Sequence, residues 1–256
     1  MTHDLQSRNY KDRSYRSYTD KNRLVSFQVA VKETDLYIKT LLNLEDEALT
    51  SILKYRYHLE EYIKRHPQFK TSLSSLPSDP ISPQIVKEMT EAGLLAGVGP
   101  MASVAGAIAE FVGNDLLSYC PEVIVENGGD IFINVKKDIK IGIFAGNSLL
   151  SKKIGLRISC SLSPLGVCTS SGTVGHSLSF GKADAVTIVS KSTTLADAAA
   201  TAVGNVVKSA SHIEDGLEAA QNIKGVLGTI IIVADKLGAW GDVDLCSFED
   251  GESLCF

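Results

Sequence analysis

Apolar and polar residues alternate in the first part of the chain. The alternation runs from Leu24 to Val31 and again from Leu36 to Ile38, on either side of Glu33-Thr34-Asp35. Successive side chains of a strand point to opposite faces, so a period of two residues is typical of a half-buried strand. We therefore expect the fold to open with two strands joined as a hairpin.

Two longer segments have helical periodicity. From Glu45 to His66 apolar residues recur at helical spacing, with acid in the first turn and Lys64-Arg65-His66 in the last, before Pro67. These charges complement a helix dipole and predict an amphipathic surface helix. The segment from Met89 to Leu117 is rich in Ala and Gly and apolar on nearly all sides, which predicts one helix buried within the fold.

The second half of the chain mixes short β-branched runs with helical segments. We expect an antiparallel meander over 123–125, 131–135, 140–144 and 154–159, a further strand at 185–189, a central strand at 228–234 that closes the set, and helices at 197–208 and 211–221. Ser211 and Glu214 match a capping box at the start of the last helix. Without regular βαβ alternation, this order favours an α+β fold, a mainly antiparallel sheet with helices packed on it.

The chain is long enough for one large domain, which we place over residues 24–256. Residues 1–23 are polar, with tyrosines among the charges, and we expect a mobile arm there. Residues 72–83 are rich in proline and serine, which predicts a loop or linker.

Composition and charge exclude several classes of protein. Of the 256 residues, 44% are apolar and 21% are charged, which excludes a disordered chain, a collagen and a coiled coil. The net charge of −5 argues against a nucleic-acid partner. No apolar stretch reaches the roughly 18–20 residues of a membrane helix, and the N-terminus lacks the apolar core of a secretory signal. We expect a cytoplasmic protein without a membrane partner; homo-oligomerisation stays open.

The cysteines do not indicate a metal site or a disulfide framework. There are five, widely spaced and never arranged as Cys-x-x-Cys: Cys120, Cys160, Cys168, Cys246 and Cys255. An odd, scattered set of this kind is typical of reduced thiols. We interpret Cys120, Cys160 and Cys168 as buried, unreactive side chains; the alternative is a part in sulfur chemistry, for Cys168 above all.

Three glycine-rich segments are candidates for ligand binding. They are Gly97-Val98-Gly99-Pro100-Met101-Ala102, Glu126-Asn127-Gly128-Gly129-Asp130, and Cys168-Thr169-Ser170-Ser171-Gly172-Thr173-Val174-Gly175-His176-Ser177. Glycines allow a phosphate to approach the main chain closely, and a helix N-terminus offers free N–H groups to an anion. The same residues also suit close helix packing and a hairpin turn. A P-loop is excluded, because the lysine that it requires is missing.

One carboxylate stands out in a helical segment. Asp197 precedes Thr201 by one helical turn, so a carboxylate and a hydroxyl share a helix face, a pair of hard oxygen ligands suited to Mg²⁺. The alternative is that Asp197 only stabilises a helix N-terminus. Asp184 is interpreted as a turn residue before a strand.

Taken in this order, these segments resemble a family of uncharacterised proteins related to ApbE, the magnesium-dependent flavin transferases. The resemblance to the uncharacterised family covers Tyr15 to Trp240, and the resemblance to the transferases covers mainly Gly97 to Asn205. It rests on the three glycine-rich segments and on Glu33-Thr34-Asp35-Leu36, Gly181-Lys182-Ala183-Asp184-Ala185 and Ala196-Asp197-Ala198-Ala199-Ala200-Thr201. The resemblance implies an ApbE-like fold, Mg²⁺, and a phosphate-bearing small molecule such as FAD or FMN.

The resemblance also implies roles for individual residues. It places the metal on Asp197, Thr201 and a main-chain oxygen near Ala96, and the proton carrier at His176 or Glu126. By position it places the phosphate-bearing ligand against Gly128, Gly129, Asp130, Ser171 and Gly172. The glycine-rich segments themselves add the candidate ligand contacts Gly97, Gly99, Asn127, Thr169, Ser170 and Thr173. The chain departs from the transferases after His176, where Ser177-Leu178-Ser179-Phe180-Gly181 replaces their Asp-Pro and Thr, and at Gly99 or Pro100, where they have a lysine.

Three functions are consistent with this sequence. The first is an ApbE-like enzyme that binds the ligand with Mg²⁺ and transfers a nucleotidyl or FMN group. The second is a role in sulfur assimilation, the incorporation of sulfide into homocysteine, which the resemblance to the uncharacterised family implies. The third is a ligand-binding module without catalysis.

Overall fold

The computed structural model describes residues 23–172 and 181–248. Its main element is an eight-stranded sheet in the order β1-β2-β3-β4-β7-β8-β9-β10, and a second sheet has the order β11-β6-β5. Every strand pair in the described residues is antiparallel. The strands are β1 Val25–Val31, β2 Thr34–Thr40, β3 Val123–Asn127, β4 Asp130–Asn134, β5 Ile139–Gly142, β6 Ile154–Ile158, β7 Leu165–Ser170, β8 Ala185–Ser190, β9 Val226–Val233, β10 Lys236–Gly241 and β11 Asp244–Ser247.

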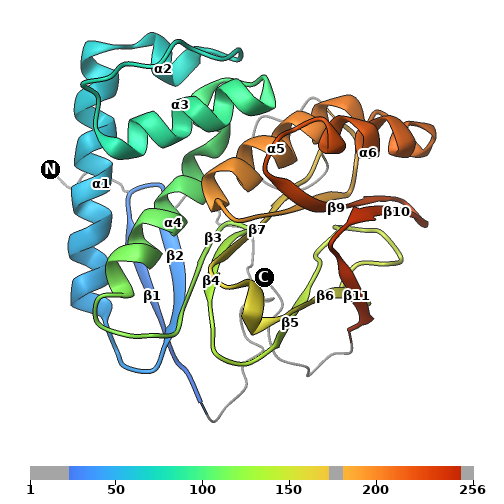
Figure 1. Ribbon diagram of the computed structural model, residues 1–256, viewed down its shortest axis with the longest axis horizontal. Helices are drawn as coiled ribbons and strands as arrows, with labels where there is room; N and C mark the ends of the chain where they lie inside the picture. Colours follow the sequence, from blue (N-terminus) through green and yellow to red (C-terminus); the bar gives the residue numbers. More distant parts are fainter. Residues whose placement is uncertain (1–22, 173–180, 249–256) are drawn as a thin grey trace, which may run out of the picture.

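The helices pack on one face of the large sheet and the small sheet on the other, which makes three layers (Figure 1). They are α1 Glu45–Arg65, α2 Gln68–Thr71, α3 Gln84–Ala96, α4 Val104–Leu116, α5 Thr193–Val206 and α6 Ile213–Gln221, with a 3-10 turn η2 at Pro100–Ser103. Leu36, Val125 and Phe132 of the sheet meet α1, α3 and α4 in one buried cluster. Ile133, Val167 and Ile232, on the other face, meet the small sheet. This is the predicted α+β architecture.

The first hairpin and the first helix confirm the predictions made from hydrophobic periodicity. Strands β1 and β2 pair with Val31 opposite Thr34, so the turn is Lys32-Glu33, slightly before the predicted position. Lys32 has a φ of 53°. Helix α1 matches the predicted surface helix, and residues 72–83 form a loop, as expected.

Three expectations about single elements are wrong, and a fourth concerns the segment Met89–Leu117. The predicted meander is divided, because β4 pairs with β7 while β5 and β6 belong to the small sheet. Strand β9 is flanked on both sides but does not close the fold, since β10 and β11 follow. The predicted capping box is absent: the Ser211 hydroxyl meets Ser209 Oγ at 2.8 Å, and α6 begins after His212 with no side-chain cap.

The single helix expected over Met89–Leu117 is two helices. Helix α3 ends at Gly97, whose φ of +70° is left-handed, and the chain turns by 104° between α3 and the segment from Pro100 to Leu116. Glycine adopts this conformation without strain, so it commonly ends a helix. In the described residues no single helix is long and apolar enough to cross a membrane, and only this bent pair meets that criterion jointly.

Candidate functional site

The Asn-Gly-Gly-Asp segment forms the turn between β3 and β4. Asn127 pairs with Asp130 across the hairpin, and Gly128 and Gly129 have φ values of +67° and +107°. Two successive residues with positive φ are the requirement of a tight hairpin, so the glycines are explained by the turn. The Gly129 N–H donates to Glu126 Oε1 at 2.9 Å and is therefore occupied.

The sheet separates the two carboxylates that flank this turn. Asp130 lies opposite Cys168 of β7, and Cys168 belongs to the buried cluster beneath α5. Asp130 therefore faces the helices. Glu126 lies opposite Ile131, which belongs to the cluster between the two sheets. Because cross-strand partners share a face, Glu126 points to the side of the small sheet.

Asp197 is partly buried and packs against the first turn of α4. It lies in the second turn of α5, after an N-cap at Ser192 whose side chain accepts from Leu195 N–H. Its Oδ2 accepts the Gly106 N–H at 2.8 Å. Burial raises the pKa of Asp197 to about 7, although the N–H groups of Gly106 and Ala105 act to lower it. The helix N-terminus that it stabilises is that of α4.

Gly106 is the residue that permits this contact. A Cβ at position 106 would lie 2.5 Å from Thr193 O and 2.7 Å from Asp197 Cβ, much closer than non-bonded atoms approach. The absence of a side chain therefore brings α4 within hydrogen-bond distance of Asp197.

Asp130 and Asp197 interact electrostatically. Burial, and then the charge of Asp197, raise the pKa of Asp130 well above its usual value. Burial, followed by the charges of both carboxylates, also raises the pKa of Cys168 well above its usual value. A thiol in this environment stays protonated and is a poor nucleophile. Two carboxylates that repel each other in a largely buried site lower their energy by binding a proton or a cation.

The neighbouring polar groups connect the turn to α4 and α5. Asn127 Nδ2 donates to Ala105 O at 3.0 Å, which fixes the hairpin beside the N-terminus of α4. In the opposite direction Glu110 of α4 accepts the Thr194 N–H at 2.8 Å and its hydroxyl at 2.7 Å. Each helix therefore contributes a carboxylate to the N-terminus of the other. Asp197 of α5 accepts an N–H at the start of α4, and Glu110 of α4 accepts an N–H at the start of α5.

The end of β7 contributes hydroxyl groups to both faces. Ser170 is nearly buried and shares the face of Cys168, and within the described residues its Oγ has no hydrogen-bond partner. Thr169 faces the other way and meets Thr187 Oγ1 at 2.9 Å. Ser171 is partly exposed, and the Gly172 N–H donates to Ala183 O at 2.9 Å. Thr173 and His176 lie outside the described residues.

The Gly97–Met101 segment has a structural explanation. The Gly99 N–H donates to Leu73 O at 3.0 Å, and a Cβ there would lie 1.9 Å from Ser72 O. Ala96 ends α3 and packs against the cluster that contains α5. The main-chain groups that contact Asp197 are those of Ala105 and Gly106. Thr201, one turn after Asp197, is partly exposed.

The oxygen atoms of Asp130, Asp197 and Thr201 are of the kind that bind a hard cation, but they would supply only some of its ligands. Carboxylate and hydroxyl oxygens are ligands that Mg²⁺ prefers, and Mg²⁺ is commonly bound by one or two carboxylates together with phosphate oxygens. In the residues described, no group of three or more His, Cys, Asp or Glu side chains is arranged to hold a metal. The described side chains alone therefore do not complete a metal site.

Sequence reasoning missed Gly106 and Glu110. Both lie in the segment that was predicted as a packing helix, and their roles depend on α5, more than eighty residues further along the chain. The small residues around Gly106 were the only signal of a close helix contact.

Comparisons with known proteins agree with this architecture. A family model described as "AbpE bacteria" matches residues 16–234. A UPF0280 protein of Methanocaldococcus jannaschii is 44% identical over 226 residues, which cover 84% of this chain and 90% of the relative. A UPF0280 protein of Methanococcus aeolicus is 39% identical over 229 residues, 86% and 91% of the two chains.

Solved structures of flavin transferases have a similar fold. The apo flavinyl transferase ApbE of Pseudomonas stutzeri aligns with a TM-score of 0.57 and 14% identity over 86% of this chain and 94% of its own. An H257G mutant of the flavin transferase ApbE from Vibrio cholerae aligns with a TM-score of 0.55 and 14% identity, over 86% and 97%. At this identity the comparison shows the fold alone.

Proposed function

This chain belongs to the family described as "AbpE bacteria", an uncharacterised family related to ApbE, and we propose that it binds a phosphate-bearing ligand with Mg²⁺ and transfers a nucleotidyl or FMN group. The ligand is FAD or another nucleotide. The observation that supports the proposal is the pair formed by the buried Asp130 and the partly buried Asp197: burial, and then the charge of Asp197, raise the pKa of Asp130. In the interior such a pair is stable only when a proton or cation offsets its charge.

The residues of the chain have distinct parts in this proposal. Asp197 and Thr201 would hold Mg²⁺ from one face of α5, with Asp130 on the adjoining strand. Ser170 Oγ would donate to a phosphate oxygen, because it is buried and without a partner among the described residues. When bound, Mg²⁺ would neutralise negative charge on the phosphate oxygens. Asn127 would act by holding the turn against Ala105.

The proposal changes two roles that were predicted from the sequence, phosphate binding by main-chain N–H groups and proton transfer. The N–H groups of Gly129 and Gly172 already donate to protein oxygens, so phosphate binding is assigned to side chains. Glu126 lies on the other face of the sheet, so His176 is kept as the candidate for proton transfer. In FMN transfer the acceptor hydroxyl would give up its proton to such a base and its oxygen would form a phosphoester bond to the FMN phosphorus, while the phosphoanhydride bond of FAD breaks and AMP leaves.

Calorimetric titration tests the proposal directly. We expect wild-type protein to bind FAD or ADP only with Mg²⁺, and Asp197→Ala to abolish that binding because it removes the metal carboxylate. Asp235→Ala is the matched control, since Asp235 is an exposed acid paired with Lys236; it should bind like wild type. Unchanged titration of Asp197→Ala would refute the assignment. A mass spectrum of any small molecule that co-purifies would identify the ligand.

A further inference from the structure

Helix α1 carries large apolar side chains on the face that points away from the core. Leu49, Leu53 and Tyr57 are 38%, 51% and 64% exposed. They follow one another at intervals of four residues, so they form one stripe along the helix. The core side of the helix is formed by Ala48, Ser51, Ile52, Tyr55, Leu59 and Tyr62. A helix that covers a single core needs only one apolar face, so the second stripe requires another explanation.

Further exposed apolar residues lie at the start of the same helix. Leu41 and Leu42 immediately precede α1, and both are exposed. The Leu41 N–H donates to Cys120 Sγ at 3.3 Å, which places the segment beside Tyr119, another exposed side chain. Single exposed apolar residues are ordinary, but a contiguous group is typical of an interaction surface.

The charges of α1 are arranged in two blocks of opposite sign. Glu45, Asp46 and Glu47 form its first turn, and Lys64 and Arg65 its last, where Lys64 is also ion-paired with Glu61. They complement the helix dipole, and their spacing also determines on which side of the helix they lie. Asp46 and Lys64 are 18 residues apart in the sequence, which is about five full turns at 3.6 residues per turn. The two blocks therefore lie on the same side of the helix, at opposite ends.

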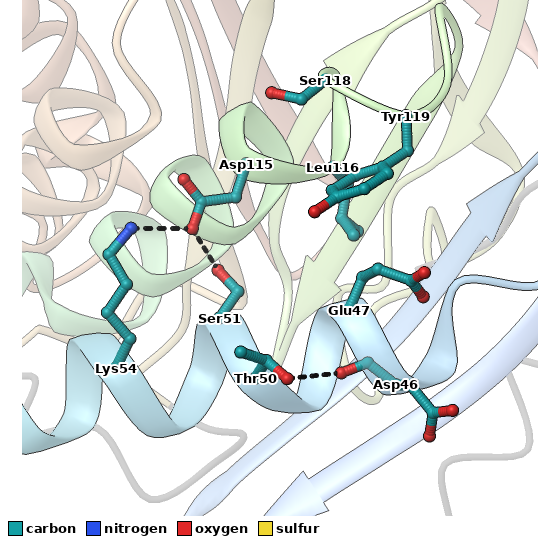
Figure 2. A pocket seen from close by; sticks show the side chains of 9 residues that line it. All are labelled: Asp46, Glu47, Thr50, Ser51, Lys54, Asp115, Leu116, Ser118 and Tyr119. Carbon is teal, nitrogen blue, oxygen red and sulfur yellow. Dashed lines mark hydrogen bonds and ion pairs between the residues drawn. The ribbon is translucent and has the colours of Figure 1, made fainter.

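The acidic block borders an open pocket of about 540 Å³ between the first half of α1 and the end of α4 (Figure 2). Asp115 in this pocket is already bound to Ser51 and Lys54. Asp46 and Glu47 form no salt bridge in the part of the chain that the structure describes. The C-terminal end of α4 adds the partial negative charge of its carbonyl groups. The pocket therefore favours a cationic side chain.

We propose that α1 forms the contact of a two-fold symmetric homodimer, in which two copies of α1 pack antiparallel. With the axis near Tyr55, Leu53 packs on the partner subunit's Tyr57, and Asp46 faces the partner subunit's Lys64. The basic last turn of each helix reaches the acidic pocket of the other subunit. The partner is a second copy of this chain because a single α1 carries both the acidic and the basic end. In a two-fold symmetric contact the acidic end of each helix then faces the basic end of the other.

Light scattering coupled to size-exclusion chromatography tests this contact on the full chain. We expect wild-type protein at about 50 μM to have twice the chain mass of 27.4 kDa, and Leu53→Glu to have the mass of one chain, because the substitution places two charges at the axis. Leu53 is half exposed, so the fold of the variant should persist, as circular dichroism would show. Leu149→Glu is the matched control, on an exposed leucine of a distant loop, and it should remain dimeric.

Charge reversal tests the antiparallel arrangement separately from the apolar stripe. Asp46→Lys and Lys64→Asp should each weaken the dimer by roughly threefold to tenfold, as expected for exposed pairs. The double variant should recover affinity, since each reversed charge again faces an opposite one in the partner. Monomeric wild type, a dimer that Leu53→Glu does not weaken, or a double variant weaker than both single variants would each overturn the proposal.

Discussion

At the scale of single residues, Asp197 combines a structural and a proposed chemical role. It accepts main-chain N–H groups at the start of α4, yet burial keeps its pKa near 7. The hydrogen bonds therefore do not compensate fully for the loss of hydration. The sequence showed that Asp197 and Thr201 share a helix face, but it did not show which helix end the carboxylate would meet.

The raised pKa of Asp197 predicts a pH-dependent stability. The folded state holds this proton up to about pH 7, whereas the unfolded chain releases it near pH 4. Between these values the folded state binds more protons, so wild-type protein loses stability as pH rises, by up to about 4 kcal/mol. The Asp197→Asn variant has no ionisable side chain at position 197. Its free energy of unfolding relative to that of wild type should therefore increase from pH 4 to pH 8.

Urea denaturation in EDTA at several pH values measures this difference. Asn accepts fewer hydrogen bonds than a carboxylate, which shifts the stability of the variant by the same amount at every pH. The informative quantity is therefore the change with pH of the difference in free energy of unfolding between variant and wild type. A stability difference that stays constant between pH 4 and pH 8 would contradict the assigned protonation.

At the scale of elements, the contact between α4 and α5 organises the candidate site. Gly106 allows the helices to approach, and each helix contributes one carboxylate to the N-terminus of the other. Periodicity predicted both helices but placed the start of α5 at Asp197, four residues late, and joined α3 to α4. The reason is that the true starts depend on caps and on Gly97, which hydrophobic spacing does not report.

The capping role of Glu110 leads to a prediction about stability. Its carboxylate accepts from the Thr194 N–H, the Thr194 hydroxyl and the Ser192 hydroxyl. Glu110→Ala leaves these donors without an acceptor and should cost about 1–3 kcal/mol. Glu214→Ala, in the exposed first turn of α6, is the control and should change stability by under about 0.5 kcal/mol. Chemical denaturation that shows equal losses for the two variants would contradict the cap.

At the scale of the whole molecule, the large sheet divides the polar residues of the β3–β4 turn between two layers. Asp130 lies in the helical layer with Asp197, and Glu126 lies in the layer of the small sheet. Residues that are neighbours in the sequence are therefore separated by the sheet. This arrangement makes the helix-side carboxylates, rather than both acids of the turn, the expected ligand site.

The two acids of the turn should therefore respond differently to substitution. Asp130→Asn should weaken Mg²⁺-dependent nucleotide binding by tenfold or more, because it removes a charge next to Asp197. Glu126→Gln should bind within about threefold of wild type, since its oxygen can still accept the Gly129 N–H. Titration calorimetry compares them directly. A larger loss in Glu126→Gln than in Asp130→Asn would place the ligand on the other face.

The sequence alone determined the kinds of element and the chemistry available to them. Period-two and helical spacing predicted the first hairpin, α1 and the α+β class, and the Gly-Gly pair predicted the β3–β4 turn, because these features depend on contacts between near neighbours. The resemblance in ordered motifs pointed to the family. Tertiary structure decided which strands pair, where Met89–Leu117 breaks, and which acids meet. Those outcomes depend on contacts between residues far apart in the chain, such as Gly106 with Asp197 and Asp130 with Cys168, and local patterns do not encode such contacts.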